Sequence, residues 1–129
     1  MDLSLTDEQQ MIQSTARQFA DAELVPTAAK VDRDGDRSGF LARLKQLAEL
    51  GFMGLNVEAE YGGSEAGSIA FSLAITEVAR ACASTAVTMS VTNMVGEVIQ
   101  ARGPRPADRP RSVRPESRKS KYPRSPPLG

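Results

Sequence analysis

The sequence contains no histidine and no tryptophan, and only one of its 129 residues is a cysteine. Without histidine, the chain cannot supply a Ser-His-Asp triad, a histidine general base or a histidine ligand to a metal. The lone cysteine, Cys82, has no partner in the chain for a disulfide, which fits a reducing compartment. With few aromatic residues, any core must be mainly aliphatic and rich in methionine.

Long apolar runs are also absent. The most apolar region, residues 68–99, is interrupted by Glu77, Arg80 and Glu97, so it does not reach the roughly 18 uninterrupted apolar residues of a membrane span. Residues 1–8 are acidic and lack the apolar core of a secretion signal. We therefore expect a cytoplasmic protein that does not cross a membrane.

Charge and proline divide the chain into two unlike parts. Residues 1–100 carry 7 Lys and Arg against 14 Asp and Glu, whereas residues 101–129 carry 9 against 2. Seven of the eight prolines follow Gln100. This break predicts a folded domain over residues 1–100 and a disordered, basic, Arg/Pro-rich tail over 101–129, which has too little apolar content to offset the entropy of ordering.

Apolar periodicity over the first hundred residues predicts an all-α fold, a small bundle of about four helices. The first helix begins after Thr6, whose hydroxyl pairs with Gln9 in a capping-box pattern, and it ends near Val25, before Pro26. Residues 27–32 are expected to form one short helical turn. The second helix covers residues 39–50, with Ser38 as its N-cap and Gly51 as a left-handed C-cap.

A third helix is predicted over residues 68–83 and a fourth from Ser84 or Thr85 to about Gln100. Glu77 and Arg80 are expected to pair on the exposed edge of the third helix. Two stripes are expected to be buried: Leu41, Leu44, Leu47, Ala48 and Leu50 on the second helix, and Val87, Val91, Met94, Val95 and Val98 on the fourth. The small polar residues of the fourth helix predict a face that meets a ligand or another domain: Thr88, Ser90, Thr92 and Asn93.

The acidic segment at residues 32–36 raises the question of a calcium loop. That pattern needs a glycine at its sixth position and a glutamate at its twelfth. Here Gly35 stands fourth and Arg43 stands twelfth, so we interpret the segment as a solvated loop and predict no metal site.

Several short stretches, in this order and spacing, resemble the acyl-CoA dehydrogenase family over about 95 residues. They are Leu5-Thr-Asp-Glu-Gln-Gln-Met, Ala16-Arg-Gln-Phe19 with Pro26, Leu47-Ala-Glu-Leu-Gly51, Gly54-Leu, Glu60-Tyr-Gly-Gly63, Ala79-Arg-Ala-Cys-Ala-Ser-Thr85 and Ser90-Val-Thr-Asn93. The resemblance implies a FAD-dependent oxidoreductase that removes hydrogens from the α and β carbons of an acyl-CoA. It also implies an N-terminal helical domain, a middle β domain and a C-terminal helical bundle that carries the catalytic glutamate.

Only the N-terminal domain of that plan matches this sequence, so we expect no catalytic residue here. Alone, the chain is not expected to hold FAD tightly or to turn over acyl-CoA. By resemblance, Thr88, Met89, Thr92 and Gly96 line the acyl pocket, and the alternative is ordinary helix packing. The expected protein partner is a separate flavin-domain subunit or a second copy of this chain. The alternative function is a non-enzymatic helical module that pairs with a flavin-domain subunit.

Three interpretations of the tail stay open. Its basic residues could attract nucleic acid or another acidic partner, although its one aromatic residue, Tyr122, and the absence of a basic fold disfavour nucleic acid. The prolines around Arg124-Ser-Pro-Pro127 could form a polyproline ligand. An abrupt Arg/Pro-rich end is also what a shifted reading frame in a GC-rich gene produces.

Overall fold

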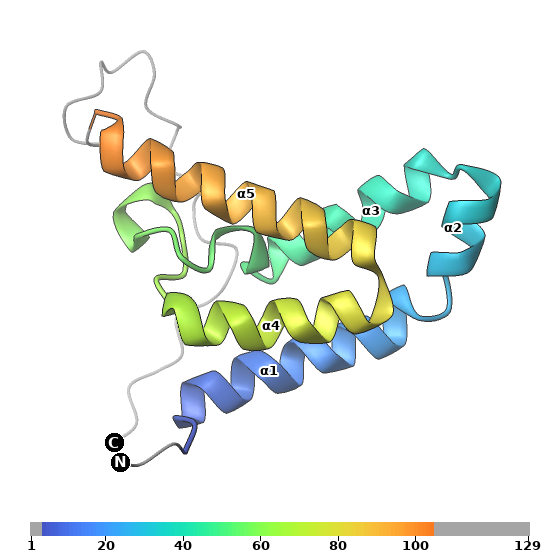
Figure 1. Cartoon of the computed structure of the whole chain (residues 1–129), viewed down its shortest axis with the longest axis horizontal. Helices are drawn as coiled ribbons and strands as arrows, with labels where there is room; N and C mark the ends of the chain where they lie inside the picture. The colour runs from blue at the N-terminus through green and yellow to red at the C-terminus, as the bar shows by residue number, and fades with distance from the viewer. Residues whose placement is uncertain (1–3, 105–129) are drawn as a thin grey trace, which may run out of the picture.

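The computed structural model describes residues 4–104, and every regular element in this range is helical (Figure 1). The five α-helices are α1 (Asp7–Phe19), α2 (Ala28–Asp34), α3 (Arg37–Glu49), α4 (Gly67–Ala81) and α5 (Ala83–Arg102). The all-α prediction is confirmed, with α2 as a short additional helix. Because α5 reaches Arg102, it extends two residues into the predicted tail, and the tail predictions from residue 105 onward lie outside the described residues.

α1 and α4 lie side by side and run in the same direction, and α5 runs back along α4 in the opposite direction (Figure 1). The segment between α3 and α4 contains two 3₁₀ turns, Phe52–Gly54 and Ala59–Tyr61, and the first of them packs against α5. α2 and the start of α3 extend away from this body. The core among these elements consists of Ala16, Phe19, Ala20, Leu24, Leu47, Phe52, Leu55, Ala74, Val78, Ala86 and Met89.

The start of α1 has the predicted capping box. The Gln9 N–H donates to the Thr6 hydroxyl oxygen at 3.2 Å, and the Thr6 N–H donates to the Gln9 side-chain oxygen at 3.0 Å. At its other end, α1 continues into a π-helical turn, Ala20–Leu24, where the Val25 N–H donates to the Ala20 carbonyl. The helical path therefore ends where Pro26 was expected to end it.

The predicted Ser38 cap of α3 is wrong, because Asp36 is the N-cap. A carboxylate oxygen of Asp36 accepts the Gly39 N–H at 3.0 Å and the Ser38 hydroxyl at 2.7 Å. These bonds hold the pKa of Asp36 below its ordinary value, the Gly39 N–H being the main cause. Gly35, with a φ of 59°, ends α2 in the left-handed region, so the chain turns early enough for Asp36 to cap α3.

The predicted buried stripe of α3 is largely wrong. Leu47 is the only residue of α3 that is buried, and Leu41, Ala48 and Leu50 are exposed. For Leu41 the reason is the placement of α3, whose first part leaves the body together with α2 (Figure 1). The left-handed Gly51 after this helix is confirmed, with a φ of 83°.

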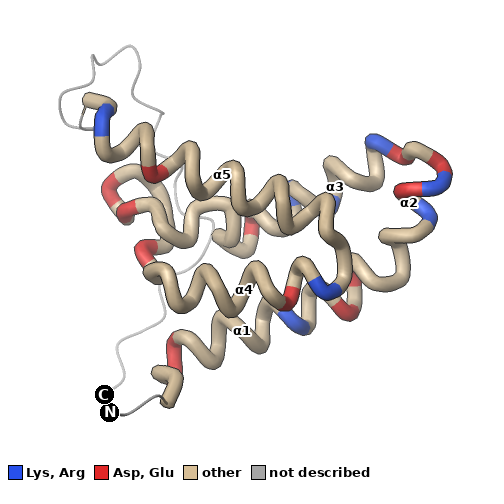
Figure 2. The backbone as a smooth tube through the Cα atoms, viewed as in Figure 1, with Lys and Arg blue, Asp and Glu red and all other residues tan. Residues whose placement is uncertain are grey.

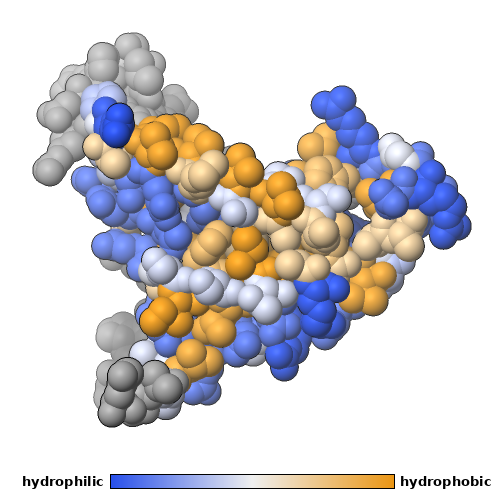
Figure 3. Space-filling view, viewed as in Figure 1, coloured by the Kyte–Doolittle hydropathy of each residue, from blue (hydrophilic) through white to orange (hydrophobic). Residues whose placement is uncertain are grey.

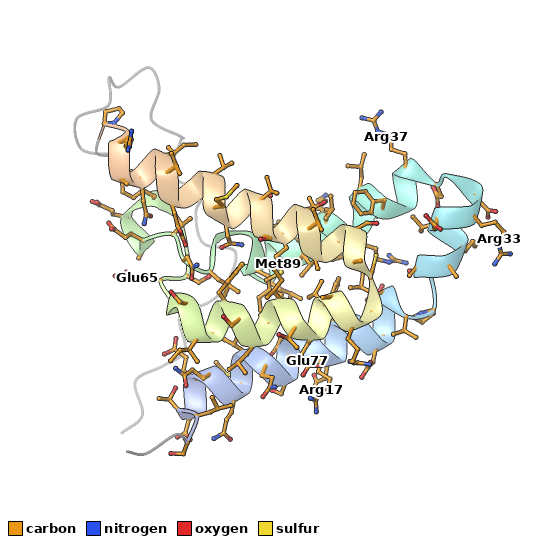
Figure 4. All side chains as sticks on the ribbon, viewed as in Figure 1. Arg17, Arg33, Arg37, Glu65, Glu77 and Met89 are labelled. Carbon is orange, nitrogen blue, oxygen red and sulfur yellow. The ribbon has the colours of Figure 1, made fainter. Side chains whose placement is uncertain are left out.

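Glu77 on α4 is buried, so its predicted place on an exposed edge is wrong, although its predicted pairing with Arg80 is confirmed. Its carboxylate accepts two hydrogen bonds from Arg17 on α1, at 2.7 and 3.1 Å, and lies 3.5 Å from Arg80 (Figure 4). The Arg17 hydrogen bonds are the main reason that the pKa of Glu77 is below its ordinary value. The partner that buries Glu77 lies sixty residues away in sequence, beyond the range of a helix-periodicity argument.

We expect Glu77→Gln to lower the free energy of unfolding at neutral pH by about 1–2 kcal/mol, a modest value because Arg17 is 59% exposed to water. A carboxylate whose folded pKa is lowered stabilises the fold above its unfolded pKa, here near 4.5, and loses this effect as the pH falls through the folded value. Urea unfolding at a series of acidic pH values measures this. The variant should lose less stability on acidification than the parent, and a Glu49→Gln control should follow the parent.

Candidate functional site

α5 has two different faces, and this arrangement decides which side chains can meet a ligand or a partner. Its inward face is formed by the buried residues Thr85, Ala86, Met89 and Asn93. On the outward face, six large apolar side chains each expose 46–61% of their area: Val87, Val91, Met94, Val95, Val98 and Ile99. Figure 3 shows hydrophobic side chains gathered along this helix.

The predicted burial of the stripe from Val87 to Val98 is therefore wrong. The structure turns that stripe outward and places Thr85, Ala86, Met89 and Asn93 inward. This face is covered because α5 packs against α4 and against the Phe52 turn, where Met89 joins the core and Asn93 bonds to the Phe52 carbonyl.

The four predicted pocket residues lie in three different settings. Thr88 is half-buried and Thr92 is exposed, and they are joined along the helix by the Thr92 hydroxyl, which donates to the Thr88 carbonyl at 2.7 Å. The Thr88 hydroxyl donates to the Ser84 carbonyl at 2.9 Å. Gly96, one further helical step along, lies against Val57, where an added Cβ would meet a methyl group at 2.6 Å. These three residues border one side of the outward face.

Met89 differs from the other three because it is entirely buried in this chain. Figure 4 shows it between α5 and α4, and it belongs to the core cluster with Phe52 and Val78. A side chain in this position supports the helix that carries Thr88 and Thr92. Whether Met89 also contacts an acyl chain stays a prediction.

Asn93, which the sequence placed on a polar outer face, points inward instead. Its amide nitrogen donates to the Phe52 carbonyl at 2.9 Å and to the Met89 carbonyl at 3.0 Å, and its oxygen accepts the Asn56 N–H at 3.3 Å. It thereby fixes the irregular segment after Gly51 against α5. This residue was missed because its partners are backbone groups of a distant loop, which no local pattern identifies.

A cavity of about 700 Å³ lies where the start of α3 faces the α4–α5 turn, and Cys82 is part of its wall. The volume would admit a small ligand. The charges do not fit FAD, because Asp32 and Asp36 line the cavity with Arg37 and would repel the two phosphates of a dinucleotide. We therefore assign no flavin-binding role to this cavity.

Among residues 4–104, no group of three or more His, Cys, Asp or Glu side chains is arranged to hold a metal ion. The acidic segment at 32–36 instead forms the end of α2 and the cap of α3. No helix in the same range is long and apolar enough to span a bilayer. Figure 2 shows that charged residues are sparse along α5 compared with the α2 arm and the α1–α4 edge.

The helical order and the two-faced α5 can be compared with known proteins. The family model for the acyl-CoA dehydrogenase N-terminal domain matches residues 6–106. The chain belongs to the acyl-CoA dehydrogenase family. It is 42% identical over 91 residues to the mitochondrial short-chain specific acyl-CoA dehydrogenase of Mus musculus, a match that covers 70% of this chain and 22% of that enzyme.

Two microbial relatives show a similar match. A protein named probable acyl-CoA dehydrogenase YngJ, of Bacillus subtilis, is 38% identical over 96 residues, which are 74% of this chain and 25% of that protein. Acryloyl-CoA reductase (NADH) of Anaerotignum propionicum is 39% identical over 92 residues, which are 70% of this chain and 23% of that enzyme. The chain thus spans about a quarter of the length of these members of its family, and the match covers their N-terminal helical domain.

Proposed function

We propose that this chain supplies the helical wall of the acyl-CoA site to a flavin-dependent oxidoreductase of the CH–CH type. FAD, when bound by a partner domain or subunit, would supply the hydride acceptor. The residues of this chain would bind and orient the acyl group and exclude water from it. No proton transfer is assigned to any carboxylate described above, because Glu77 is already engaged by Arg17 and Asp36 caps a helix.

The observation that carries this proposal is the surface of α5 beside its outward face. Each threonine hydroxyl there donates to a backbone carbonyl of its own helix, so Thr88 and Thr92 are already satisfied as donors and present a largely aliphatic surface. At Gly96 the space that a side chain would occupy is filled by a methyl group of Val57, so the line available to an acyl chain is the one that Thr88 and Thr92 form. An uncharged, small-residue line of this kind suits an acyl chain.

A separate partner is proposed to hold FAD, because the cavity of this chain has the wrong charge for a dinucleotide. The cavity lined by Asp32 and Asp36 does not suit a dinucleotide, and the excess of acidic residues over residues 1–100 adds to that repulsion. The exposed apolar face of α5 offers the contact for a flavin-binding domain. A helical module without its own enzymatic role, which only stabilises such a subunit, is the alternative.

A chimera tests the proposal. The 91 matched residues of the mouse short-chain enzyme are replaced by the corresponding residues of this chain, and flavin absorbance and acyl-CoA-dependent reduction of an electron acceptor are measured. We expect the chimera to retain flavin and activity. The 129-residue chain, incubated with excess FAD and then desalted, should be colourless.

Within an active chimera, Thr92→Leu is expected to lower kcat/KM for long acyl-CoA substrates by about tenfold more than for short ones, because a larger side chain shortens the pocket. Thr76→Leu is the matched control, since Thr76 is an exposed threonine on α4 whose hydroxyl also donates to a carbonyl four residues back. If Thr92→Leu leaves the dependence of kcat/KM on acyl-chain length unchanged while flavin is retained, then α5 does not line the acyl pocket. The non-enzymatic helical module is then the function that remains.

A further inference from the structure

The row of α5 residues that faces the proposed acyl group ends at a side chain from a distant part of the sequence. Thr88, Thr92 and Gly96 follow one another at steps of four residues, which places them in one row along the helix. A Cβ added at Gly96 would meet the Cγ2 methyl of Val57 at 2.6 Å. The methyl therefore fills the space beside this glycine, which we name the Gly96 notch, at the far end of the row.

Val57 is held firmly by the loop that carries it. Its carbonyl accepts the Glu65 N–H at 3.0 Å, and its N–H donates to the Gly54 carbonyl at 3.2 Å. The backbone of Gly63 lies directly behind it, because a Cβ added there would stand 2.5 Å from the Val57 Cβ. Valine is branched at Cβ, which restricts rotation about χ1. The side chain therefore has little freedom to withdraw from the notch.

The loop is also bound to α5 on both sides of the Gly96 notch. The Asn56 N–H donates to the Asn93 side-chain oxygen at 3.3 Å, and the Glu58 N–H donates to the Gln100 side-chain oxygen at 2.8 Å. These two α5 residues lie three positions before and four positions after the notch. Contacts within this chain thus fix the position of the Val57 methyl relative to α5.

We propose that Val57 is a specificity-determining residue, whose methyl group closes the far end of the acyl row and limits the length of the acyl chain. This rests on the proposed function, because the acyl group must run along Thr88 and Thr92. A chain that ends before the Gly96 notch meets no obstacle. A longer chain must displace a side chain that both the loop and α5 hold in place. Gly96 thereby acts by receiving Val57 instead of by touching the acyl group.

Opening and refilling the notch in the active chimera tests the proposal. Val57→Ala is expected to raise the ratio of kcat/KM for long acyl-CoA substrates to that for short ones by about tenfold, because it empties the notch. Adding Gly96→Ala to this variant should return the ratio to the parent value, since the new methyl enters the same space from α5. Val25→Ala, the same truncation at an exposed position, is the matched control and should leave the ratio unchanged.

A loss of packing alone has a different signature. It would lower kcat/KM for long and short substrates together, in step with the flavin retained per protein, whereas opening the notch raises kcat/KM for long substrates. Val57→Ile tests the opposite direction and keeps the notch filled. Because the Gly63 backbone leaves no room behind Val57, the added methylene should extend toward the row and lower the ratio.

The outcomes separate this inference from the proposed function. If Thr92→Leu changes the ratio and the Val57 variants do not, α5 lines the pocket but Val57 is not its end, so this inference alone is overturned. A raised ratio in Val57→Ala that Gly96→Ala does not reverse also overturns it, because the gain then arises outside the notch. If the chimera is inactive, or Thr92→Leu also leaves the ratio unchanged, the proposed function fails and this inference fails with it.

Discussion

Met89→Ala is expected to lower the free energy of unfolding by about 2–5 kcal/mol, the range measured when a fully buried large apolar side chain is truncated. Met89 has no exposed area and packs in the core with Phe52 and Val78. Truncation removes these contacts and leaves a cavity that the surrounding helices can fill only in part. Chemical unfolding followed by circular dichroism measures the loss.

The matched control is Met94→Ala, the same truncation one and a half turns further along the same helix. Met94 is 56% exposed, so its change should stay within about 0.5 kcal/mol when the chain is monomeric. Near-equal effects at the two positions would show that Met89 is not a core residue in solution. It would then be free to line a pocket, as the family resemblance implies.

Features that depend on neighbouring residues could be predicted from the sequence. The Thr6–Gln9 box and the left-handed Gly51 each need only a few consecutive residues, and both are confirmed. The failed Ser38 cap is a local error of the same kind, since Asp36 offers a competing acceptor two residues earlier. The presence of this helix was therefore predictable, whereas its cap depended on whether the turn at Gly35 favoured Asp36 or Ser38 as the acceptor.

The direction that each helix faces was not predictable in the same way. α5 carries apolar residues on both sides, so periodicity identifies two candidate core faces without choosing between them. The choice is made by tertiary contacts, above all those of Asn93, whose partners lie 37 and 41 residues away. Glu77 was misplaced for the same reason, because Arg17 comes from another helix.

The structure separates the four predicted pocket residues, and their contact with an acyl chain stays a prediction. Thr88, Thr92 and Gly96 do form one line beside the outward face, and Met89 lies inside the core instead of along that line. A sequence pattern cannot separate these settings, because the four residues lie within nine positions of one helix. Only the position of the Phe52 turn under α5 shows which of them are covered.

Asn93→Leu is expected to lower the free energy of unfolding by about 2–4 kcal/mol, although leucine has the same branching of side-chain atoms and a better helix propensity. The Asn93 amide is the hydrogen-bond partner of the Phe52 carbonyl and the Asn56 N–H within the described chain. Leucine leaves the Asn56 N–H without the Asn93 oxygen and removes one donor from the Phe52 carbonyl, where water has little access, and a buried backbone group left unpaired costs about 1–3 kcal/mol. Urea unfolding gives the loss, and hydrogen exchange at Asn56 should quicken.

Asn56→Ala supplies the contrast, because it removes the same kind of side chain from the other side of the same contact. The side-chain oxygen of Asn56 is buried and has no hydrogen-bond partner among residues 4–104, while its backbone N–H, which bonds to Asn93, survives the substitution. Removing an unpartnered acceptor should cost little or stabilise the fold. If both variants lose the same stability, the packing of the two side chains, and not the Asn93 hydrogen bonds, holds the loop against α5.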